Sequence, residues 1–459
     1  MTPMALARIA QWTHGRLLGD DLPIDAVATD TRTLDARDRR ATLFVALKGE
    51  RFDGHDHVAA AADRGARAAL VSREVDAPLP QVVVADTERA LAALASAMQR
   101  SRTTRVVGIT GSNGKTSVKQ LVHAIAARSL RAYANPGNRN NEIGLPLAVI
   151  DAPEDAEVAV YEMGAGKPGD IAYLTAIARP DVALVNNIAP AHLERMHSLL
   201  GIADTKAAVY DALPHDGVAV INADDAFAPY FAERAHGRRL LRFGLEASAD
   251  VTARAVSSDA DGSRFVLVAP TGEVDVVLPL PGRHNVSNAL AAASIALALG
   301  IPLEEIAAAL GDAQPVKGRL VQHRLAGGAV LIDDSYNANP GSLNAAIDTL
   351  ASGGGEAWLV LGDMRELGGD ARDLHAEAGR RARRAGLARV YALGPLSAAA
   401  AEAFGEGGRH FDHHDALAAA LAADLHPGVR MLVKGSRGSA MDRIVDALLA
   451  RATGEHDAA

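Results

Sequence analysis

The residues with the clearest chemical use lie in the stretch GITGSNGKTSVK, from Gly108 to Lys119. Gly111 and Gly114 would let backbone N–H groups turn toward phosphate oxygens, and the helix expected after them adds positive potential at its N-terminus. Lys115 would reach the terminal phosphates, and Thr116 could hold Mg²⁺. Five residues separate Gly108 from Gly114, one more than in the general phosphate-loop pattern. Because the inner Gly-x-x-Gly-Lys-Thr core is intact, we predict a nucleotide site rather than a plain glycine-rich turn.

Three polar residues farther along the chain are candidates for the rest of such a site. Glu162 ends an apolar strand at the sheet edge where α/β proteins bind ligands, so it could coordinate Mg²⁺ or be a solvated strand-end acid. His192 follows another expected strand and could be a metal ligand or a structural histidine. Lys206 stands in GIADTKAAVY, and this pattern alone indicates a lysine on the surface of a helix.

Several longer motifs, in their order along the chain, resemble those of the Mur ligases, the ATP-dependent amide-forming enzymes of peptidoglycan precursor synthesis. The family's phosphate loop is Thr-Gly-x-x-Gly-Lys-Ser/Thr, which residues 110–116 match, and this accounts for the glycine spacing. TDTRTL and LFVALKGERFDGHDHV resemble the uridine-nucleotide-binding domain that two of these ligases share. The motifs similar to those of members that use D-alanyl-D-alanine are GNRNNEIGLP (137–146), DDSYNANPGS (333–342), LGDMRELG (361–368) and VKGSR (433–437). The Asp-Asn-Pro-Arg motif of the ligase that adds the third amino acid is absent.

The resemblance implies roles for individual residues. Lys115, Glu162, His192 and Lys206 would be catalytic, and Thr116, Glu162, His192 and Lys206 would organise two Mg²⁺ ions. Lys206 would be carbamylated, although the acidic residue that usually follows two or three positions later is missing. ATP would contact Lys115, Thr116 and the following residues: Gly111, Ser112, Asn113, Gly114, Ser117, Asn288, Arg319, Asp334, Tyr336 and Asn337. UDP-N-acetylmuramoyl-tripeptide would contact Thr31, Arg32, Lys48, Gly49, Asp53, Gly54, His55, Asn138 and Asn141. LGDMRELG could be a ligand site but is more typical of a structural turn.

The implied reaction is amide formation between UDP-N-acetylmuramoyl-tripeptide and D-alanyl-D-alanine. ATP would phosphorylate the peptide carboxylate, and the amine would then attack the acyl phosphate. Three alternatives remain open: a phosphate-loop kinase or NTPase of another pathway, a catalytically silent binding protein, and a related ligase with another amine donor, such as a folylpolyglutamate or cyanophycin synthetase. A kinase or NTPase would give no reason for HNVSNALAA, KGRL and DDSYNANP in this order.

Short apolar strands alternate with helices along the chain, which predicts an α/β fold with parallel sheets. We expect a small uridine-nucleotide-binding domain (1–100), a central phosphate-loop domain with a mostly parallel sheet (101–322) and a Rossmann-like C-terminal domain (323–459). Residues 249–282 are expected to form an antiparallel excursion, and a hinge is expected near 320–326. The predicted strands are 41–47, 68–72, 81–86, 106–110, 158–163, 182–188, 217–224, 329–336, 357–364, 389–394 and 430–436.

Bulk composition narrows the function classes. A formal net charge of −9 without a long basic run argues against nucleic-acid binding, and the lack of cysteine excludes disulfides and thiolate metal sites. The apolar run 286–303 contains Asn288 and Ser294 and stops at Gly-Ile-Pro, so we predict a buried helix rather than a membrane span. We expect a cytoplasmic protein that is a monomer.

Overall fold

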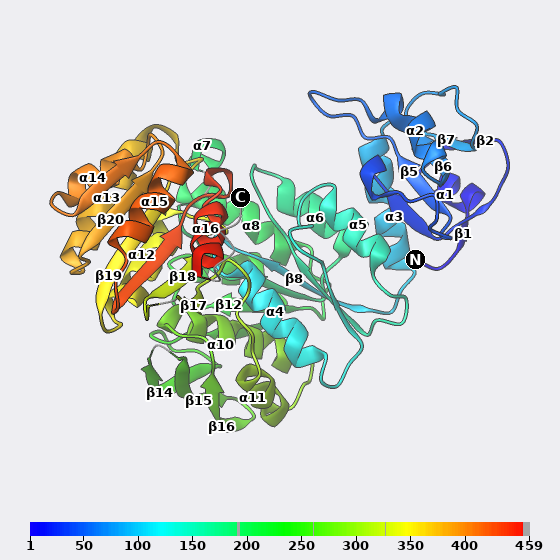
Figure 1. The fold of residues 1–459 in the computed structure, drawn as a ribbon. Coiled ribbons are helices and arrows are strands. Elements are labelled where there is room, and N and C mark those ends of the chain that lie inside the picture. Colours follow the sequence, from blue (N-terminus) through cyan, green and yellow to red (C-terminus); the bar gives the residue numbers. More distant parts are fainter. Residues whose placement is uncertain (191–192, 260, 326, 453–459) are drawn as a thin grey trace.

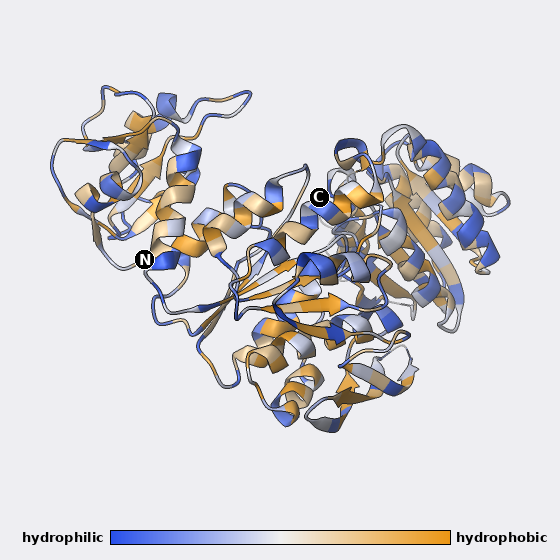
Figure 2. Ribbon diagram, turned by 180° about the vertical axis from the view of Figure 1, so that it is seen from behind, coloured by the Kyte–Doolittle hydropathy of each residue, from blue (hydrophilic) through white to orange (hydrophobic). Residues whose placement is uncertain are grey.

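The computed structural model describes residues 1–190, 193–259, 261–325 and 327–452. Three regions, each built on its own main sheet, follow one another along the chain. The blue N-terminal region and the orange C-terminal region lie on opposite sides of the central region in Figure 1. The predicted α/β class is confirmed. In Figure 2 the strands are mostly orange and the outer helix faces carry most of the blue, so the apolar side chains lie between the layers.

The N-terminal sheet has five strands, and only its β2–β7 pair is antiparallel. Its spatial order is β2 (Arg16–Leu18), β7 (Gln81–Val83), β6 (Ala66–Val71), β5 (Thr42–Val45) and β4 (Ala26–Ala28). A short pair, β1 (Met4–Ala5) and β3 (Pro23–Ile24), lies beside it. The helices are α1 (Leu6–Trp12), α2 (Val58–Asp63) and α3 (Thr87–Arg100), with short turns of 3-10 helix at η1 (Thr31–Thr33) and η2 (Gly54–His57).

The central sheet has six parallel strands. Their order is β13 (Arg239–Phe243), β12 (Val218–Asn222), β11 (Val182–Val185), β8 (Arg105–Thr110), β10 (Val158–Glu162) and β9 (Ala132–Ala134). The chain leaves β8 toward β9 on one side and leaves β11 toward β12 on the other. Such a switch in direction opens a crevice at the carboxyl ends of the two strands, where ligands bind in α/β proteins. The helices are α4 (Lys115–Ala126), α5 (Gly144–Asp151), α6 (Asp170–Ala178), α7 (Leu193–Met196), α8 (Leu199–Asp211) and α9 (Ala228–Arg234).

The predicted antiparallel excursion is confirmed by a three-stranded sheet: β14 (Thr252–Ser258), β15 (Ser263–Ala269) and β16 (Gly272–Leu278). The predicted apolar helix is α10 (Arg283–Ala298), which is followed by α11 (Leu303–Gly311). Most of α10 is buried, including Asn288 and Ser294. No helix among the described residues is long and apolar enough to span a membrane.

The C-terminal sheet has six strands, and only β17 is antiparallel to its neighbour. Its order is β17 (Val321–Arg324), β18 (Val330–Asp334), β22 (Val429–Lys434), β19 (Glu356–Gly362), β20 (Arg389–Leu393) and β21 (Gly408–Phe411). Apolar clusters lie on both of its faces. The helices are α12 (Pro340–Ala351), α13 (Ala371–Arg384), α14 (Ala398–Phe404), α15 (His414–Asp424) and α16 (Asp442–Ala452), with short turns η3 (Gly368–Asp370) and η4 (Arg437–Ser439).

The domain boundaries remain a prediction, and the sheets lie close to them. Helix α3 ends at Arg100, and β8 of the central sheet begins at Arg105. Strand β17 begins at Val321 and pairs with β18, so the third sheet starts two residues before the predicted boundary at 323.

Candidate functional site

The phosphate loop has the strand, loop and helix that its sequence predicts. It leaves β8 after Thr110, and α4 begins at Lys115. Gly111 and Gly114 have φ angles of 144° and 79°, a region that side chains other than glycine rarely adopt. The backbone N–H groups of Ser112 and Asn113 donate to the carbonyl and side-chain oxygens of Asn187, each at 2.9 Å. Because Asn187 follows β11, the loop is anchored across the crevice between β8 and β11.

Lys115 lies over this loop. Its Nζ donates to the carbonyl oxygens of Gly111 at 2.7 Å and Ser112 at 3.2 Å. Burial lowers its pKa, and the charge of Glu162 opposes that effect. An ammonium group held this way can be offered to phosphate oxygens without moving the helix on which it stands.

Glu162 is the centre of a buried polar network. Its side chain accepts hydrogen bonds from Thr116 Oγ1 at 2.8 Å and from Asn140 Nδ2 at 2.9 Å. The residue is only 4% exposed, so the solvated strand-end acid considered from the sequence is wrong. Burial by itself raises the pKa of Glu162, but the charges of Lys115 and Lys119, the hydrogen bond from Thr116 and the charge of Arg319 together hold that pKa below its usual value. The carboxylate therefore stays ionised.

A carboxylate beside a hydroxyl is a hard-oxygen donor set, which fits Mg²⁺ when phosphate oxygens and water complete the coordination. The described residues contain no group of three or more His, Cys, Asp or Glu side chains that could hold a metal ion. A metal ion at Thr116 and Glu162 would therefore need ligands from phosphate or water. His192, predicted as a metal ligand, lies outside the described residues.

Lys206 lies inside the protein on α8 and is only 2% exposed. The surface position that its sequence pattern indicated is wrong, because the pattern does not show which face of the helix packs inward. Burial, and then the charge of Lys115, lower the pKa of Lys206 to about 7. A large fraction of this amine is thus neutral near pH 7.

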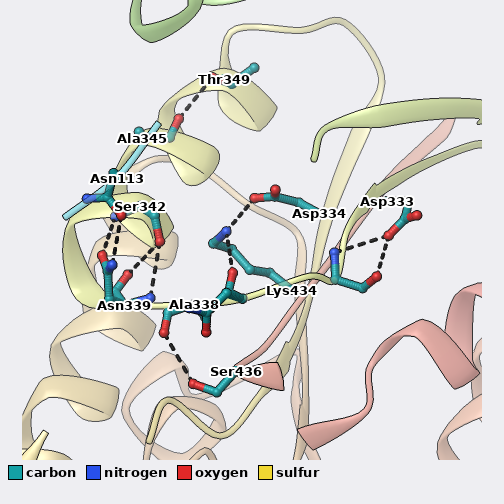
Figure 3. Close-up of polar contacts among 12 residues, drawn as sticks. Asn113, Asp333, Asp334, Ala338, Asn339, Ser342, Ala345, Thr349, Lys434 and Ser436 are labelled. Atoms are coloured by element: carbon teal, nitrogen blue, oxygen red, sulfur yellow. Dashed lines mark hydrogen bonds and ion pairs between the residues drawn. The ribbon is translucent and has the colours of Figure 1, made fainter. Parts of the chain in front are cut away.

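Arg319, just before β17, and Asn339, in the C-terminal region, contact the start of α4 and the phosphate loop. Arg319 donates to Thr116 Oγ1 at 2.8 Å, and its guanidinium lies 4.5 Å from the ring centre of Tyr336. Asn339, the N-cap of α12, donates from Nδ2 to Asn113 Oδ1 at 2.7 Å (Figure 3). The DDSYNANP loop therefore reaches the nucleotide loop directly.

Asp334 is held by a lysine from another strand. Lys434 Nζ, at the end of β22, donates to Asp334 Oδ2 at 2.5 Å (Figure 3). It also donates to the carbonyl of Asn337 at 2.9 Å. Burial raises the pKa of Asp334, against the effect of Lys434. Two residues on, Ser436 donates to the carbonyl of Ala338 at 3.2 Å. Strand β22 thus fixes the shape of the loop that carries Tyr336 and Asn337.

These elements surround one cavity of about 730 Å³ between the central and C-terminal regions. A second cavity of about 850 Å³ shares Ser117, Asn285, Arg319 and Leu320 with the first. Asn288, predicted at the adenine, lines the first cavity, but its Oδ1 already accepts from Asn186 Nδ2 at 3.1 Å. The sequence-predicted residues that line the first cavity are Ser112, Asn113, Gly114, Lys115, Ser117, Asn141, Glu162, Asn288, Arg319, Asp334, Tyr336 and Asn337.

The predicted uridine-nucleotide contacts lie apart from this cavity, in the N-terminal region. Thr31 and Arg32 form η1, where Arg32 is paired with Asp30 at 2.6 Å. Asp53 caps η2 and accepts from the ring of His55 at 2.6 Å. His55 Nε2 accepts from the backbone N–H of Ser72 at 2.7 Å, so both ring nitrogens are used within the fold. Lys48 is exposed, Gly49 lies in the loop before η2, and Gly54 begins η2. Asn138 is exposed and does not line the cavity.

Several residues of the site were missed from the sequence: Lys119, Asn135, Asn140, Asn339 and Lys434. Asn140, Asn339 and Lys434 stand in the motifs 137–146, 333–342 and 433–437, which pointed to these segments without singling out the residues. For Lys119 the signal was its spacing of four positions from Lys115, which places both on one side of α4. In the motif LGDMRELG, Asp363 has a structural role. Its carboxylate accepts hydrogen bonds from the backbone N–H groups of Leu396 and Ser397.

The chain matches three family models. They are the Mur ligase family catalytic domain at residues 24–102, the Mur ligase middle domain at 109–296 and the Mur ligase glutamate ligase domain at 318–437. The UDP-N-acetylmuramoyl-tripeptide–D-alanyl-D-alanine ligase of Escherichia coli K12 is 42% identical over 451 residues, covering 98% of this chain and 99% of that protein.

Solved structures show the same architecture. MurF from Acinetobacter baumannii superposes with a TM-score of 0.92 at 33% identity, over 98% of this chain and 99% of that one. MurF ligase from Thermotoga maritima in complex with ADP gives a TM-score of 0.82 at 28% identity, over 94% and 98% of the two chains. The family resemblance found in the motifs is confirmed over nearly the whole chain.

Proposed function

The chain belongs to the Mur ligase family, and we propose that it joins D-alanyl-D-alanine to UDP-N-acetylmuramoyl-tripeptide. The products are UDP-N-acetylmuramoyl-pentapeptide, ADP and phosphate. The name of the E. coli relative, which matches 98% of the chain, states this reaction. The observation that supports it best is the single cavity shared by the phosphate loop, Glu162 and the DDSYNANP loop, because ATP and a carboxylate can meet there.

The chemistry follows from the poor reactivity of a carboxylate toward an amine. A carboxylate oxygen of the tripeptide takes the γ-phosphoryl group of ATP, and ADP leaves. The amine of D-alanyl-D-alanine attacks the acyl carbon, and phosphate leaves with the former carboxylate oxygen. Lys115 lowers the electrostatic cost of bringing the carboxylate to the triphosphate, because its ammonium lies over the phosphate loop. Closure of the cavity by the C-terminal region would keep water from the acyl phosphate.

The proposed metal site uses Thr116 and Glu162. Their oxygens are 2.8 Å apart in a pocket where the carboxylate stays ionised, which suits Mg²⁺. Mg²⁺ bound there would offset phosphate charge. The number of ions and the role of His192 remain predictions.

Lys206 is the proposed site of carbamylation. Only a neutral amine can add CO₂, and a pKa of about 7 in a buried position leaves a large neutral fraction at physiological pH. The product would carry a negative charge near Lys115, which the buried unmodified amine cannot supply.

Three further assignments belong to the same proposal. Residues 1–100 bind the uridine nucleotide through the loops at η1 and η2, the protein acts as a monomer, and the reaction takes place in the cytoplasm because it consumes ATP. Sedimentation and cell fractionation would test the last two.

The decisive experiment is phosphate release from ATP and Mg²⁺, with each substrate alone and with both, followed by mass spectrometry. Release that requires both substrates, with a nucleotide-linked pentapeptide as product, supports the proposal. Release without either substrate would favour an NTPase. Release with glutamate in place of D-alanyl-D-alanine would favour a related ligase with another amine donor.

A further inference from the structure

Lys119 is a buried cation that the proposed reaction does not use. Its side chain is 0% exposed on α4, one turn after Lys115. Its Nζ donates to the carbonyl oxygens of Asn135 at 2.9 Å and Gly137 at 3.2 Å, and it lies 3.5 Å from Glu162 Oε2. A buried ammonium group is costly unless its donors are paired, and these three partners match its three N–H groups.

The partners of Lys119 come from two different parts of the site. Glu162 ends β10, whereas Asn135 and Gly137 lie in the loop that follows β9. The side chain of Asn135 joins the two parts a second time: its Oδ1 accepts from the backbone N–H of Glu162 at 2.9 Å, and its Nδ2 donates to the carbonyl of Glu162 at 3.1 Å. Lys119 therefore lies at the point where hydrogen bonds connect the loop after β9 to the end of β10.

The same loop forms a wall of the cavity. Asn140 and Asn141 line the cavity, and Asn140 also donates to Glu162 Oε1. One oxygen of the carboxylate thus faces Thr116 and Lys119, and the other is held by the loop. A displacement of Lys119 would loosen both the carboxylate and the loop, because only the contacts of Thr116, Asn140 and Asn135 would then hold them.

We propose that Lys119 is a positioning residue that holds the Glu162 carboxylate toward Thr116 and holds the 135–141 loop in the shape that receives the peptide end of the uridine-nucleotide substrate. Lys119 contacts neither substrate itself. This inference rests on the proposed function, since it assigns the 135–141 loop to that substrate.

Two substitutions separate the charge of Lys119 from its hydrogen bonds. Lys119→Met removes both, whereas Lys119→Gln keeps N–H donors for the loop carbonyls and removes the charge near Glu162. For Lys119→Met we expect increases of about tenfold or more both in the KM for UDP-N-acetylmuramoyl-tripeptide and in the Mg²⁺ concentration for half-maximal rate. The KM for D-alanyl-D-alanine should change less than about twofold, because the contacts of Lys119 are to Glu162 and to the loop after β9. Compared with Lys119→Met, Lys119→Gln should bring the KM for UDP-N-acetylmuramoyl-tripeptide closer to its native value. The Mg²⁺ concentration for half-maximal rate should return less far toward its native value.

Val122→Ala is the matched control. Val122 is buried on the same helix within an apolar cluster, so its truncation lowers the melting temperature without altering either KM. Calorimetric binding of UDP-N-acetylmuramoyl-tripeptide, without turnover, supplies a readout independent of activity and should be weakened by Lys119→Met alone. If Lys119→Met does not fold, Lys119→Gln carries the test through its Mg²⁺ dependence.

Lys119 variants that, like Val122→Ala, change only the melting temperature would overturn the inference. Equal rises in both KM values would also overturn it, because they would indicate general disruption. A native protein that forms no pentapeptide would instead overturn the proposed function, and with it the role assigned to the loop.

Discussion

Lys115 is the residue on which phosphoryl transfer depends most directly in this account. Its ammonium is held over the phosphate loop by two carbonyl oxygens, so it is in place before the nucleotide binds. We expect Lys115→Ala to lower kcat/KM by about 100-fold or more, as removal of a preorganised charge contact does in other enzymes. Lys317→Ala, at an exposed lysine, should leave the rate unchanged. Comparable rates in the two variants would contradict the role of Lys115.

The lowered pKa of Lys206 predicts that the stability of the protein depends on pH. Its pKa falls from 10.5 to about 7 on folding, so between these values the unfolded chain binds more protons than the native protein. The contribution of an unmodified Lys206 to stability is therefore smallest below about pH 7 and increases as the pH rises toward 10.5. In CO₂-free buffer, the melting temperature of the native protein should rise relative to that of Lys206→Met between about pH 6.5 and about pH 9. A difference that stays constant with pH would contradict a neutral buried amine.

The position of some site residues could be predicted from the sequence, and that of others could not. Lys115 and Thr116 could be predicted because strand, glycine loop and helix are adjacent in the chain. Lys119, Lys206 and Lys434 could not be placed, since a single lysine in a helix or at a strand end has the same local pattern whether it is exposed or buried. Their burial arises from packing between segments as much as 100 residues apart, as in the pair of Lys434 with Asp334.

The element that depends most on one residue is the turn from β8 into α4. Gly114 has a φ of 79°, and a Cβ atom there would lie 2.4 Å from both Asn186 Nδ2 and Asn288 Oδ1. Gly114→Ala adds a backbone cost of about 1 kcal/mol to that clash. We expect it to abolish ADP binding by calorimetry.

Gly369→Ala is the comparison for this prediction, because no atom of the described residues lies within 4 Å of a Cβ atom at Gly369. It should bind ADP like the native protein. Native-like ADP binding by Gly114→Ala would show that the close approach of the loop to Asn186 and Asn288 is unimportant.

The strands that could be predicted are the inner strands of each sheet. The missed strands of the three main sheets are β2 and β4, β9 and β13, and β17 and β21, and each pair consists of the two edges of one sheet. An edge strand has a neighbour on one side only and needs fewer apolar residues, as in the sequences RLLRF of β13 and VQHR of β17. The continuous apolar runs that reveal a buried parallel strand are therefore lacking.

On the scale of the whole molecule, the bond between Asn339 and Asn113 links the C-terminal region to the nucleotide loop. Asn339→Asp keeps an N-cap for α12 but replaces the donor to Asn113 with a carboxylate oxygen. We expect a near-native melting temperature and a KM for ATP raised by about tenfold, because closure over a triphosphate would meet a like charge. An unchanged KM would contradict closure through this contact.

We expect the C-terminal region to move about a hinge near residues 320–326, and this closure can be measured in solution by X-ray scattering. Scattering should show a more compact particle when an ATP analogue and both substrates are added to the native protein, and a smaller change for Asn339→Asp. A profile that ligands leave unchanged would contradict the hinge.

Transfer of an oxygen atom from the tripeptide to phosphate reports whether this cavity activates the carboxylate as an acyl phosphate. UDP-N-acetylmuramoyl-tripeptide labelled with ¹⁸O in its terminal carboxylate would be turned over with ATP and D-alanyl-D-alanine. If the acyl phosphate forms, one labelled oxygen leaves in the released phosphate while the pentapeptide forms. Pentapeptide without label in the phosphate, or labelled tripeptide recovered intact beside hydrolysed ATP, would contradict an acyl phosphate.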